Sequence, residues 1–201
     1  SRCFELNEVA ANRSLKLGKY KDAKHMYSNL FKLASRFLDQ ESVAKIEENL
    51  NELKIRNLLH VVECSLLLND VNAARNELNR LEDTIIKKDE LIFEKELLSS
   101  KVNLEEGNDD QAFDIANKLI NYDNLNQSQT DELLLILAQI HDNKDEDDKA
   151  LNIYTKMNST LKEENLKKAN ILSKICDIYV QHDKVEEAKK IGINGLKISE
   201  R

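Results

Sequence analysis

The stretch NRSLKLGKYKDAKHMY, from Asn12 to Tyr27, contains the end of one helix, a tight turn and the start of a second helix. Apolar residues before Gly18 recur at the spacing of one helix face. Gly18 can adopt left-handed backbone angles without a Cβ clash, so it is expected to end the first helix. A second apolar series follows at steps of three and four, which places these side chains on one face of the next helix: Tyr20, Ala23, Tyr27, Leu30 and Ala34.

These residues resemble the tetratricopeptide repeat family. The family pattern has a Gly, an aromatic residue two positions later, an Ala three further and an aromatic residue four further. Gly18, Tyr20, Ala23 and Tyr27 match all four positions. The Pro that often closes the family's repeat is missing, because the chain contains no Pro. The resemblance implies antiparallel helix pairs that stack into a superhelix and bind other proteins.

The alanine at the centre of this pattern recurs along the chain. The matching positions are separated by 51, 38, 38 and 38 residues: Ala23, Ala74, Ala112, Ala150 and Ala188. A fixed period of this size, with a helix–turn–helix in each unit, predicts a solenoid. The period exceeds the ~34 residues of a standard tetratricopeptide repeat by about one helical turn. The longer first gap predicts an extra or extended helix, and residues 41–69 are compatible with one long helix or with two.

The predicted fold is therefore an all-α, right-handed superhelical array of antiparallel helical hairpins. We expect a single domain over residues 1–201, with units at about 3–38, 39–88, 89–122, 127–158 and 160–199. Four Gly and no Pro among 201 residues are too few for the turns of a sheet protein of this size. Because the first residue is not Met and the helical pattern begins at once, we expect a fragment of a longer protein.

The composition narrows the classes of partner and compartment. The formal net charge is −7, which is a poor basis for binding phosphate backbones. No apolar run is long enough to span a membrane, so no membrane insertion is expected. Three widely spaced cysteines in apolar patterns are typical of buried free thiols in a reducing compartment. We therefore expect an intracellular protein, located in the cytoplasm or the nucleus.

In tetratricopeptide arrays the first helix of each pair lines a concave groove. The resemblance, carried over by register, places ten polar residues of this chain in that groove, with leucines between several of them. The set is mixed and mildly acidic, which predicts a basic and apolar partner segment, either a helix or an extended peptide. The alternative is that these charges form only a solvated face. The groove residues are Glu8, Asn12, Arg56, Glu63, Glu94, Lys101, Glu132, Gln139, Asn170 and Asp177.

Some members of the family hold a peptide's terminal carboxylate with Lys, Asn and Arg side chains. Here Asn12 matches the first Asn, but Glu8 occupies the position of the Lys one turn earlier. His60 replaces the second Asn, and Glu94 and Leu98 replace the basic residues of the third unit. Two acids at cation positions argue against carboxylate binding and for a basic ligand.

No motif predicts catalysis, a metal or a cofactor. His60 and Cys64 lie four residues apart, but a structural zinc needs four ligands, and a core thiol beside a boundary imidazole explains the pair better. A Cys–His nucleophile lacks an orienting third group. In the acidic run 142–148, Lys144 and Asp147 break the ligand pattern of a calcium loop, and acids there favour the dipole of the next helix.

The sequence thus predicts a non-enzymatic scaffold or adaptor that binds a protein segment in its groove, with no small-molecule substrate. The alternative within the same class is a structural subunit of a large complex that docks through the edges and ends of the array. An RNA-binding helical repeat is a further alternative. It would require a basic first-helix face, and the groove residues show the opposite balance.

Overall fold

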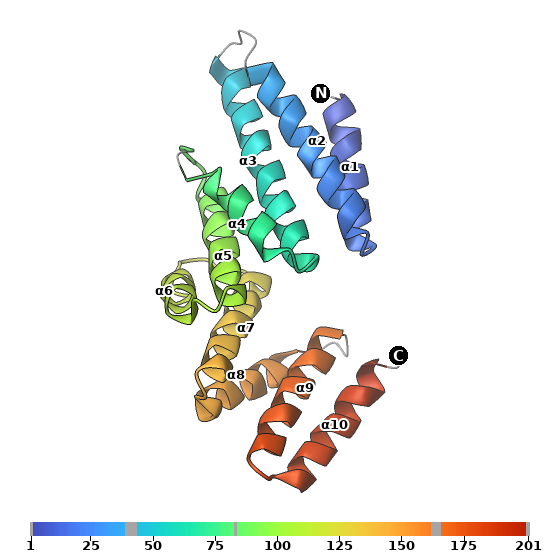
Figure 1. Ribbon diagram of the computed structural model, residues 1–201, viewed down its shortest axis with the longest axis vertical. Helices are drawn as coiled ribbons and strands as arrows, with labels where there is room; N and C mark the ends of the chain where they lie inside the picture. The colour runs from blue at the N-terminus through green and yellow to red at the C-terminus, as the bar shows by residue number, and fades with distance from the viewer. Residues whose placement is uncertain (1, 39–43, 83, 162–165, 200–201) are drawn as a thin grey trace. The chain divides into compact units, whose positions relative to one another are not determined.

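The computed structural model describes residues 2–38, 44–82, 84–161 and 166–199. Every regular element in these ranges is an α-helix, which confirms the all-α prediction (Figure 1). The ten helices are α1 (Arg2–Lys16), α2 (Tyr20–Leu38), α3 (Ala44–Leu67), α4 (Val71–Asn79), α5 (Asp89–Glu105), α6 (Asp109–Leu119), α7 (Gln127–Asn143), α8 (Asp147–Thr160), α9 (Leu166–Gln181) and α10 (Val185–Ser199).

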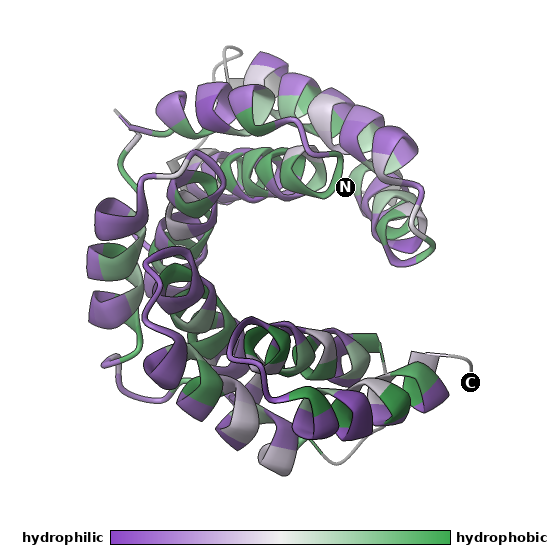
Figure 2. Cartoon of the chain, turned by 60° about the horizontal axis from the view of Figure 1, so that its bottom comes forward, coloured by the Kyte–Doolittle hydropathy of each residue, from purple (hydrophilic) through white to green (hydrophobic). Residues whose placement is uncertain are grey.

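The chain forms two compact units, Ser1–Asn108 and Asp109–Arg201. In unit 1, α2 packs between α1 and α3, and α3 also contacts α4 and α5. In unit 2, each helix from α6 to α10 packs against the next one in the chain. Several helices, among them α2 and α6, carry hydrophobic and hydrophilic residues on different faces, whereas the two kinds are not segregated in α5 (Figure 2). The division into five units within one domain stays a prediction.

Five hairpin turns share one backbone geometry. Each first helix ends at a residue with positive φ, five positions before the recurring alanine: Gly18 (71°), Asn69 (56°), Gly107 (77°), Asp145 (56°) and Asp183 (57°). The next residue donates its N–H to the carbonyl five positions earlier, as Lys19 does to Ser14 at 2.9 Å and Asn108 to Asn103 at 2.8 Å. This is the hydrogen-bond pattern of a Schellman motif, so the period predicted from the alanines is also a period of the backbone.

The recurring alanines lie where helices meet most closely. Ala23, Ala74, Ala112 and Ala150 are fully buried, and Ala188 is 4% exposed. Larger apolar residues one helical turn later fill the space beside them, among them Tyr27 and Tyr154, which are both fully buried. A small residue at each crossing lets two helix backbones approach, as the repeat pattern predicts.

The long gap between the first two alanines is explained by helix length. Residues Ala44–Leu67 form one helix of 24 residues, so this stretch contains one long helix and not two. The preceding helix, α2, has 19 residues, whereas the second helices α4 and α6 have 9 and 11. Both helices between these alanines are therefore longer than their counterparts later in the chain.

Candidate binding surface

Six of the predicted groove residues lie on the first helices of unit 1: Glu8, Asn12, Arg56, Glu63, Glu94 and Lys101. Two of them take part in a chain of contacts through Tyr27 of α2. The Tyr27 hydroxyl donates to Oδ1 of Asn12 on α1 at 2.6 Å. On its other side the Tyr27 ring stacks on His60 of α3, with ring centroids 4.6 Å apart and an interplanar angle of 27°. Asn12 is therefore used inside the first hairpin, where it fixes a core tyrosine.

His60 carries this chain of contacts on to Glu63. Its Nδ1 lies 3.5 Å from Oε2 of Glu63, a loose contact that becomes an ion pair when the imidazole is protonated. The contact with His60 is the main cause that lowers the pKa of Glu63, and Lys101 on α5 lowers it further. Burial opposes both. Glu63 is thus an ionised carboxylate beside the imidazole of its own helix and near the positive charge of Lys101 on α5.

Glu94 on α5 has the opposite electrostatic environment. Burial is the largest cause that raises its pKa above the ordinary value, and Glu63 and Glu90 raise it further. His60 and Arg56 on α3 offset only part of this. The carboxylates of α3 and α5 are therefore close enough to repel each other, and a cation placed between them would be stabilised.

Arg56 is not such a cation, because it binds a neighbouring acid on its own helix. Its Nη2 donates to Oε1 of Glu52 at 3.0 Å, and the same carboxylate pairs with Lys88. The leucines between the groove charges are also used internally: Leu59 is fully buried and Leu97 is 7% exposed. The apolar contacts expected from these two leucines are therefore unavailable to a partner, because the periodicity that places them in the groove also places them in the core.

The other four predicted groove residues lie in unit 2, on α7 and α9. Glu132 and Gln139 are half-buried on α7, and Asn170 and Asp177 are exposed on α9. Two ion pairs join these helices: Lys167 Nζ lies 3.1 Å from Asp131, and Lys174 Nζ lies 3.4 Å from Asp142. Lys167 and Lys174 of α9 are thereby paired with acids of α7.

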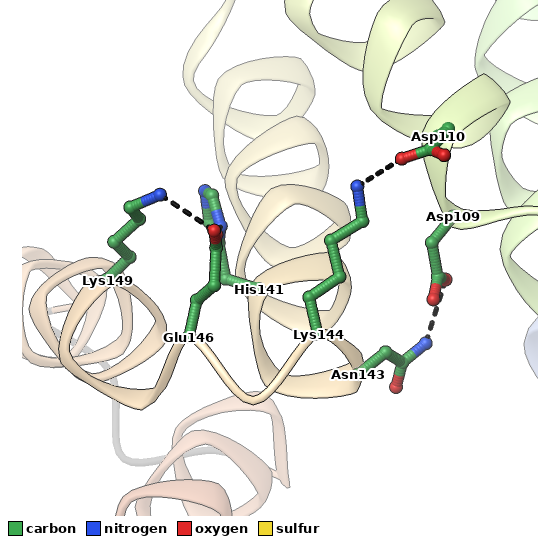
Figure 3. A network of polar contacts seen from close by, with 7 residues as sticks. All are labelled: Asp109, Asp110, His141, Asn143, Lys144, Glu146 and Lys149. Carbon is green, nitrogen blue, oxygen red and sulfur yellow. Dashed lines mark hydrogen bonds and ion pairs between the residues drawn. The ribbon is translucent and has the colours of Figure 1, made fainter.

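Polar contacts link the beginnings of α2, α4, α6 and α8 to the end of the next first helix. Figure 3 shows one of them in unit 2, where Lys144 pairs with Asp110 and Asn143 donates to Asp109 at 3.0 Å. Equivalent contacts join Lys24 to Asp70 at 3.7 Å, Arg75 to Glu106, and Asp147 to His182 at 2.8 Å. The acidic run 142–148 is thus distributed among several cations, and its Asp147 lies in the first turn of α8.

The thiols do not form a reactive or metal-binding group in the described part of the chain. Cys64 is fully buried and unpaired, and burial is the main cause that raises the pKa of its thiol to about 12. Cys176 is also free, and its Sγ donates to the carbonyl of Ala188 at 3.3 Å. Among the described residues no three His, Cys, Asp or Glu side chains are grouped in a way that could hold a metal ion.

Sequence reasoning missed the central position of His60 in the contacts of unit 1. The sequence marks His60 by its spacing from Cys64 and by its place at the second Asn position, whereas its stacking on Tyr27 depends on how α2 packs against α3. Arg75 was missed for the same reason: its guanidinium donates to Asn103 at 2.7 Å and to both carboxylate oxygens of Glu106.

The comparisons with known proteins identify the fold. No protein-family model and no curated protein matches the sequence. Among solved structures, MamA is 17% identical with a TM-score of 0.55, and the alignment covers 94% of each chain. BtubC (BKLC) from P. vanneervenii is 16% identical with a TM-score of 0.62, over 89% of this chain and 73% of that one.

A third structure contains the nearly identical TPR-like repeats of a putative kinesin light chain from Podosopora anserina. It is 11% identical with a TM-score of 0.62, over 96% of this chain and 93% of that one. The chain therefore has a TPR-like helical repeat fold, as its first turn predicts. At these identities the likeness concerns the fold alone. No helix of the described residues combines the length and apolar character needed to cross a membrane.

Proposed function

We propose that the chain is a protein-interaction scaffold whose first helices bind a basic segment of a partner protein. Stacked helical hairpins present extended surfaces, and TPR-like repeats in general serve protein interaction. The observation that carries the proposal is the pair of carboxylates contributed by α3 and α5. Burial is the largest cause that disfavours the ionised form of Glu94, and the nearby carboxylate of Glu63 adds to it. A lysine or arginine from a partner would relieve both costs.

The proposed surface of unit 1 extends from this pair to α1. Glu8 lies close enough to Tyr27 to raise the pKa of its hydroxyl, after the larger effects of burial, Cys64 and Glu63. Three first helices thus each contribute a carboxylate around Tyr27 and His60. The exposed face of α9, with Asn170 and Asp177, is proposed as a separate contact surface in unit 2. Within unit 2, Leu135, half-buried on α7, is the candidate apolar contact for a partner.

The experiment is a selection from a random peptide library on the purified chain, followed by affinity measurements on the enriched peptides. We expect enrichment of basic peptides and a loss of affinity of at least about tenfold in the variant Glu63→Lys/Glu94→Lys. The matched control is Asp22→Lys/Asp114→Lys, which makes the same charge change at exposed positions on second helices. Basic peptides that bind both variants equally would exclude this surface.

A pH titration of peptide binding separates a specific site from general charge attraction. Because burial raises the pKa of Glu94, its carboxyl group takes up a proton at a higher pH than an ordinary glutamate, and the protonated form cannot hold a cation. Affinity should therefore increase as the pH rises through the pKa of Glu94, and this increase should disappear in Glu94→Gln. An unchanged pH profile in that variant would show that Glu94 does not contact the ligand.

The remaining parts of the proposal follow from this binding role. We infer no catalytic activity, no small-molecule substrate and an intracellular location in a reducing compartment, for which the free thiols of Cys64 and Cys176 are the support. An RNA-binding role is disfavoured by the carboxylates of α3 and α5, and binding of labelled RNA to the chain at physiological salt would contradict this.

The second candidate function is docking in a large complex through the ends of the array. Exposed apolar residues on α1 and α10 support it, including Leu6 at 65% and Leu196 at 59%.

A further inference from the structure

Helix α1 exposes residues at register positions that the later first helices bury. Counted back from the recurring alanine, Arg13 is ten positions before Ala23 and is exposed. The residues at this position in the later units are buried to 1% exposure or less: Cys64, Val102, Ile140 and Ile178. Leu6 and Val9 are both 65% exposed, whereas Leu133 and Ile136, at the same two positions of α7, are 0% and 3% exposed. The exposed face of α1 thus corresponds, position by position, to the face with which a later first helix packs against the second helix of the preceding hairpin.

The later first helices show what covers this face. Val61 and Cys64 of α3 share a core cluster with Ala23, Tyr27 and Leu30 of α2. The same relation holds in unit 2, where α8 contributes Ala150, Tyr154 and Met157 to a cluster with Ile171, Ile175 and Ile178 of α9. In each case the partner is the second helix of the preceding hairpin.

Helix α10 exposes the complementary face. The residues one position after the recurring alanine are half-buried in the earlier second helices (Lys24, Arg75, Phe113 and Leu151), but Lys189 is exposed in α10. The residues three positions before that alanine behave in the same way: Val185 is 64% exposed, whereas Tyr20, Val71, Asp109 and Asp147 are half-buried. Ile193 and Leu196 add exposed apolar surface, at 49% and 59%.

We propose that α10 of one molecule packs on α1 of a second copy of the chain. The two helices would meet at the same positions at which, within the chain, the second helix of one hairpin meets the first helix of the next. The residues at the centre of the contact differ in size from those at the contacts within the chain. Where Tyr27 meets Cys64 and Tyr154 meets Ile178, a large residue of the second helix faces a smaller one of the next first helix. At the proposed contact α10 has Gly192 at the tyrosine position, where an added Cβ would lie 3.3 Å from Sγ of Cys176 on α9, and α1 has Arg13 opposite.

Charge supports the same pairing. The first turn of α10 is acidic, with Glu186 and Glu187, and the last turn of α1 is basic, with Arg13 and Lys16. This matches the contacts between hairpins within unit 2, where Asp110 in the first turn of α6 pairs with Lys144, which directly follows α7. In the proposed assembly Glu186 occupies the position of Asp110, and Lys16 lies one residue from the position of Lys144.

Because the two faces are different, the contact is heterologous and propagates from copy to copy. The test is sedimentation velocity of the 201-residue chain at rising concentration. A contact between two single helix faces is small, so association should be weak and the series should reach on the order of 1 mM. We expect the weight-average mass to rise with concentration. A chain that stays monomeric throughout would overturn the proposal.

Two blocking variants identify the faces. Val9→Asp removes the α1 face and Leu196→Asp removes the α10 face, and both residues are exposed in the monomer, so folding should survive. Each variant alone should be monomeric, whereas an equimolar mixture should form a one-to-one dimer, because each retains the face that the other lacks. Ile85→Asp, at a position that is 80% exposed and outside both faces, should associate like the unchanged chain.

A charge exchange tests the register. Lys16→Glu and Glu186→Lys should each weaken association by about tenfold, and the double variant should recover most of it. Self-association of Leu196→Asp alone would indicate a symmetric contact through α1, and would overturn the head-to-tail arrangement. A double variant that is weaker than both single variants would exclude the Lys16–Glu186 contact.

Discussion

At the residue scale, the five left-handed turn positions differ in how well their side chains fit the backbone. Gly18 and Gly107 adopt positive φ without steric cost, whereas Asn69, Asp145 and Asp183 adopt it despite their Cβ atoms. Asn and Asp tolerate this conformation better than other residues that have a Cβ, which explains why the turn survives where Gly is absent. The backbone geometry is constant while the residue varies, so the turns carry stored strain that substitution can add or remove.

Substitutions at these turns should therefore change stability in opposite directions. Gly18→Ala should destabilise the chain by about 1 kcal/mol, because a Cβ there meets no atom within 4 Å and the cost is backbone strain alone. Asp183→Gly should stabilise it by up to about 1 kcal/mol for the same reason. Urea denaturation followed by circular dichroism measures both. An unchanged midpoint for Gly18→Ala would show that this turn relaxes to another conformation.

The two buried tyrosines at equivalent register positions differ in their hydroxyl contacts. Tyr27 donates to Asn12 at 2.6 Å, whereas the buried hydroxyl of Tyr154 has no partner among the described residues. Tyr27→Phe should therefore cost about 1 kcal/mol, and Tyr154→Phe should be neutral or stabilising. Thermal unfolding of the two variants and the double variant tests this contrast. A large loss in Tyr154→Phe would reveal a hydrogen bond to that hydroxyl in solution.

At the element scale, α3 and α5 hold two glutamates whose pKa values shift in opposite directions. The pKa of Glu63 is lowered, so its carboxylate stabilises the fold at neutral pH, and this stability is lost as the pH falls through its folded-state pKa. The pKa of Glu94 is raised, so its contribution is present at acidic pH and is lost as the pH rises through its folded-state pKa.

The two amide variants should consequently have opposite effects at pH 7. Glu63→Gln should lower the unfolding midpoint and Glu94→Gln should raise it. Both differences should vanish in acid: for Glu94→Gln as the pH falls toward the ordinary value of 4.5, and for Glu63→Gln only below that value. Urea midpoints measured across the acidic and neutral range provide the check. A Glu94→Gln variant that is less stable at pH 7 would show that the ionised carboxylate is satisfied in the free chain.

The sequence predicts helices and turns better than it predicts surfaces. The spacing of the alanines and of Gly18 and Gly107 is sufficient for the helix order and the turn positions, because both follow from local backbone geometry and a small residue at each crossing. The single helix across residues 44–67 was left open, since its polar first half fits a helix or a break equally well.

The binding surface is less predictable because it depends on which side of each helix a neighbour covers. Leu59 and Glu63 are one helical turn apart, yet Leu59 is fully buried, whereas the Glu63 side chain is 40% exposed. The partners of Arg56 and Asn12 also come from packing: a salt bridge with Glu52 and a hydrogen bond from Tyr27. Register assigns a residue to the first helix, but only the packed helices decide whether its side chain faces solvent.

At the scale of the whole molecule, the chain combines a repeated local geometry with a division into two compact units. Each unit has apolar clusters of its own, such as the one around Val62 and Leu98 in unit 1 and the one around Tyr154 and Ile175 in unit 2. In repeat proteins stability is a sum of terms within repeats and between neighbours, so a perturbation decays with distance along the chain. The division into two units therefore predicts that a substitution that destabilises one unit has little effect on the other.

Hydrogen exchange should detect this limit. Ala74→Leu and Ala150→Leu each force a larger side chain into a fully buried helix crossing and should cost about 1–3 kcal/mol. Ala74→Leu should speed amide exchange within residues 1–108, and Ala150→Leu within residues 109–201, each with little effect on the other range. Ala73→Leu, at the half-buried neighbouring position on α4, is the matched control for the first variant. If either substitution accelerates exchange equally in both ranges, the ten helices unfold as one cooperative block, and the two compact units do not act as independent units of stability.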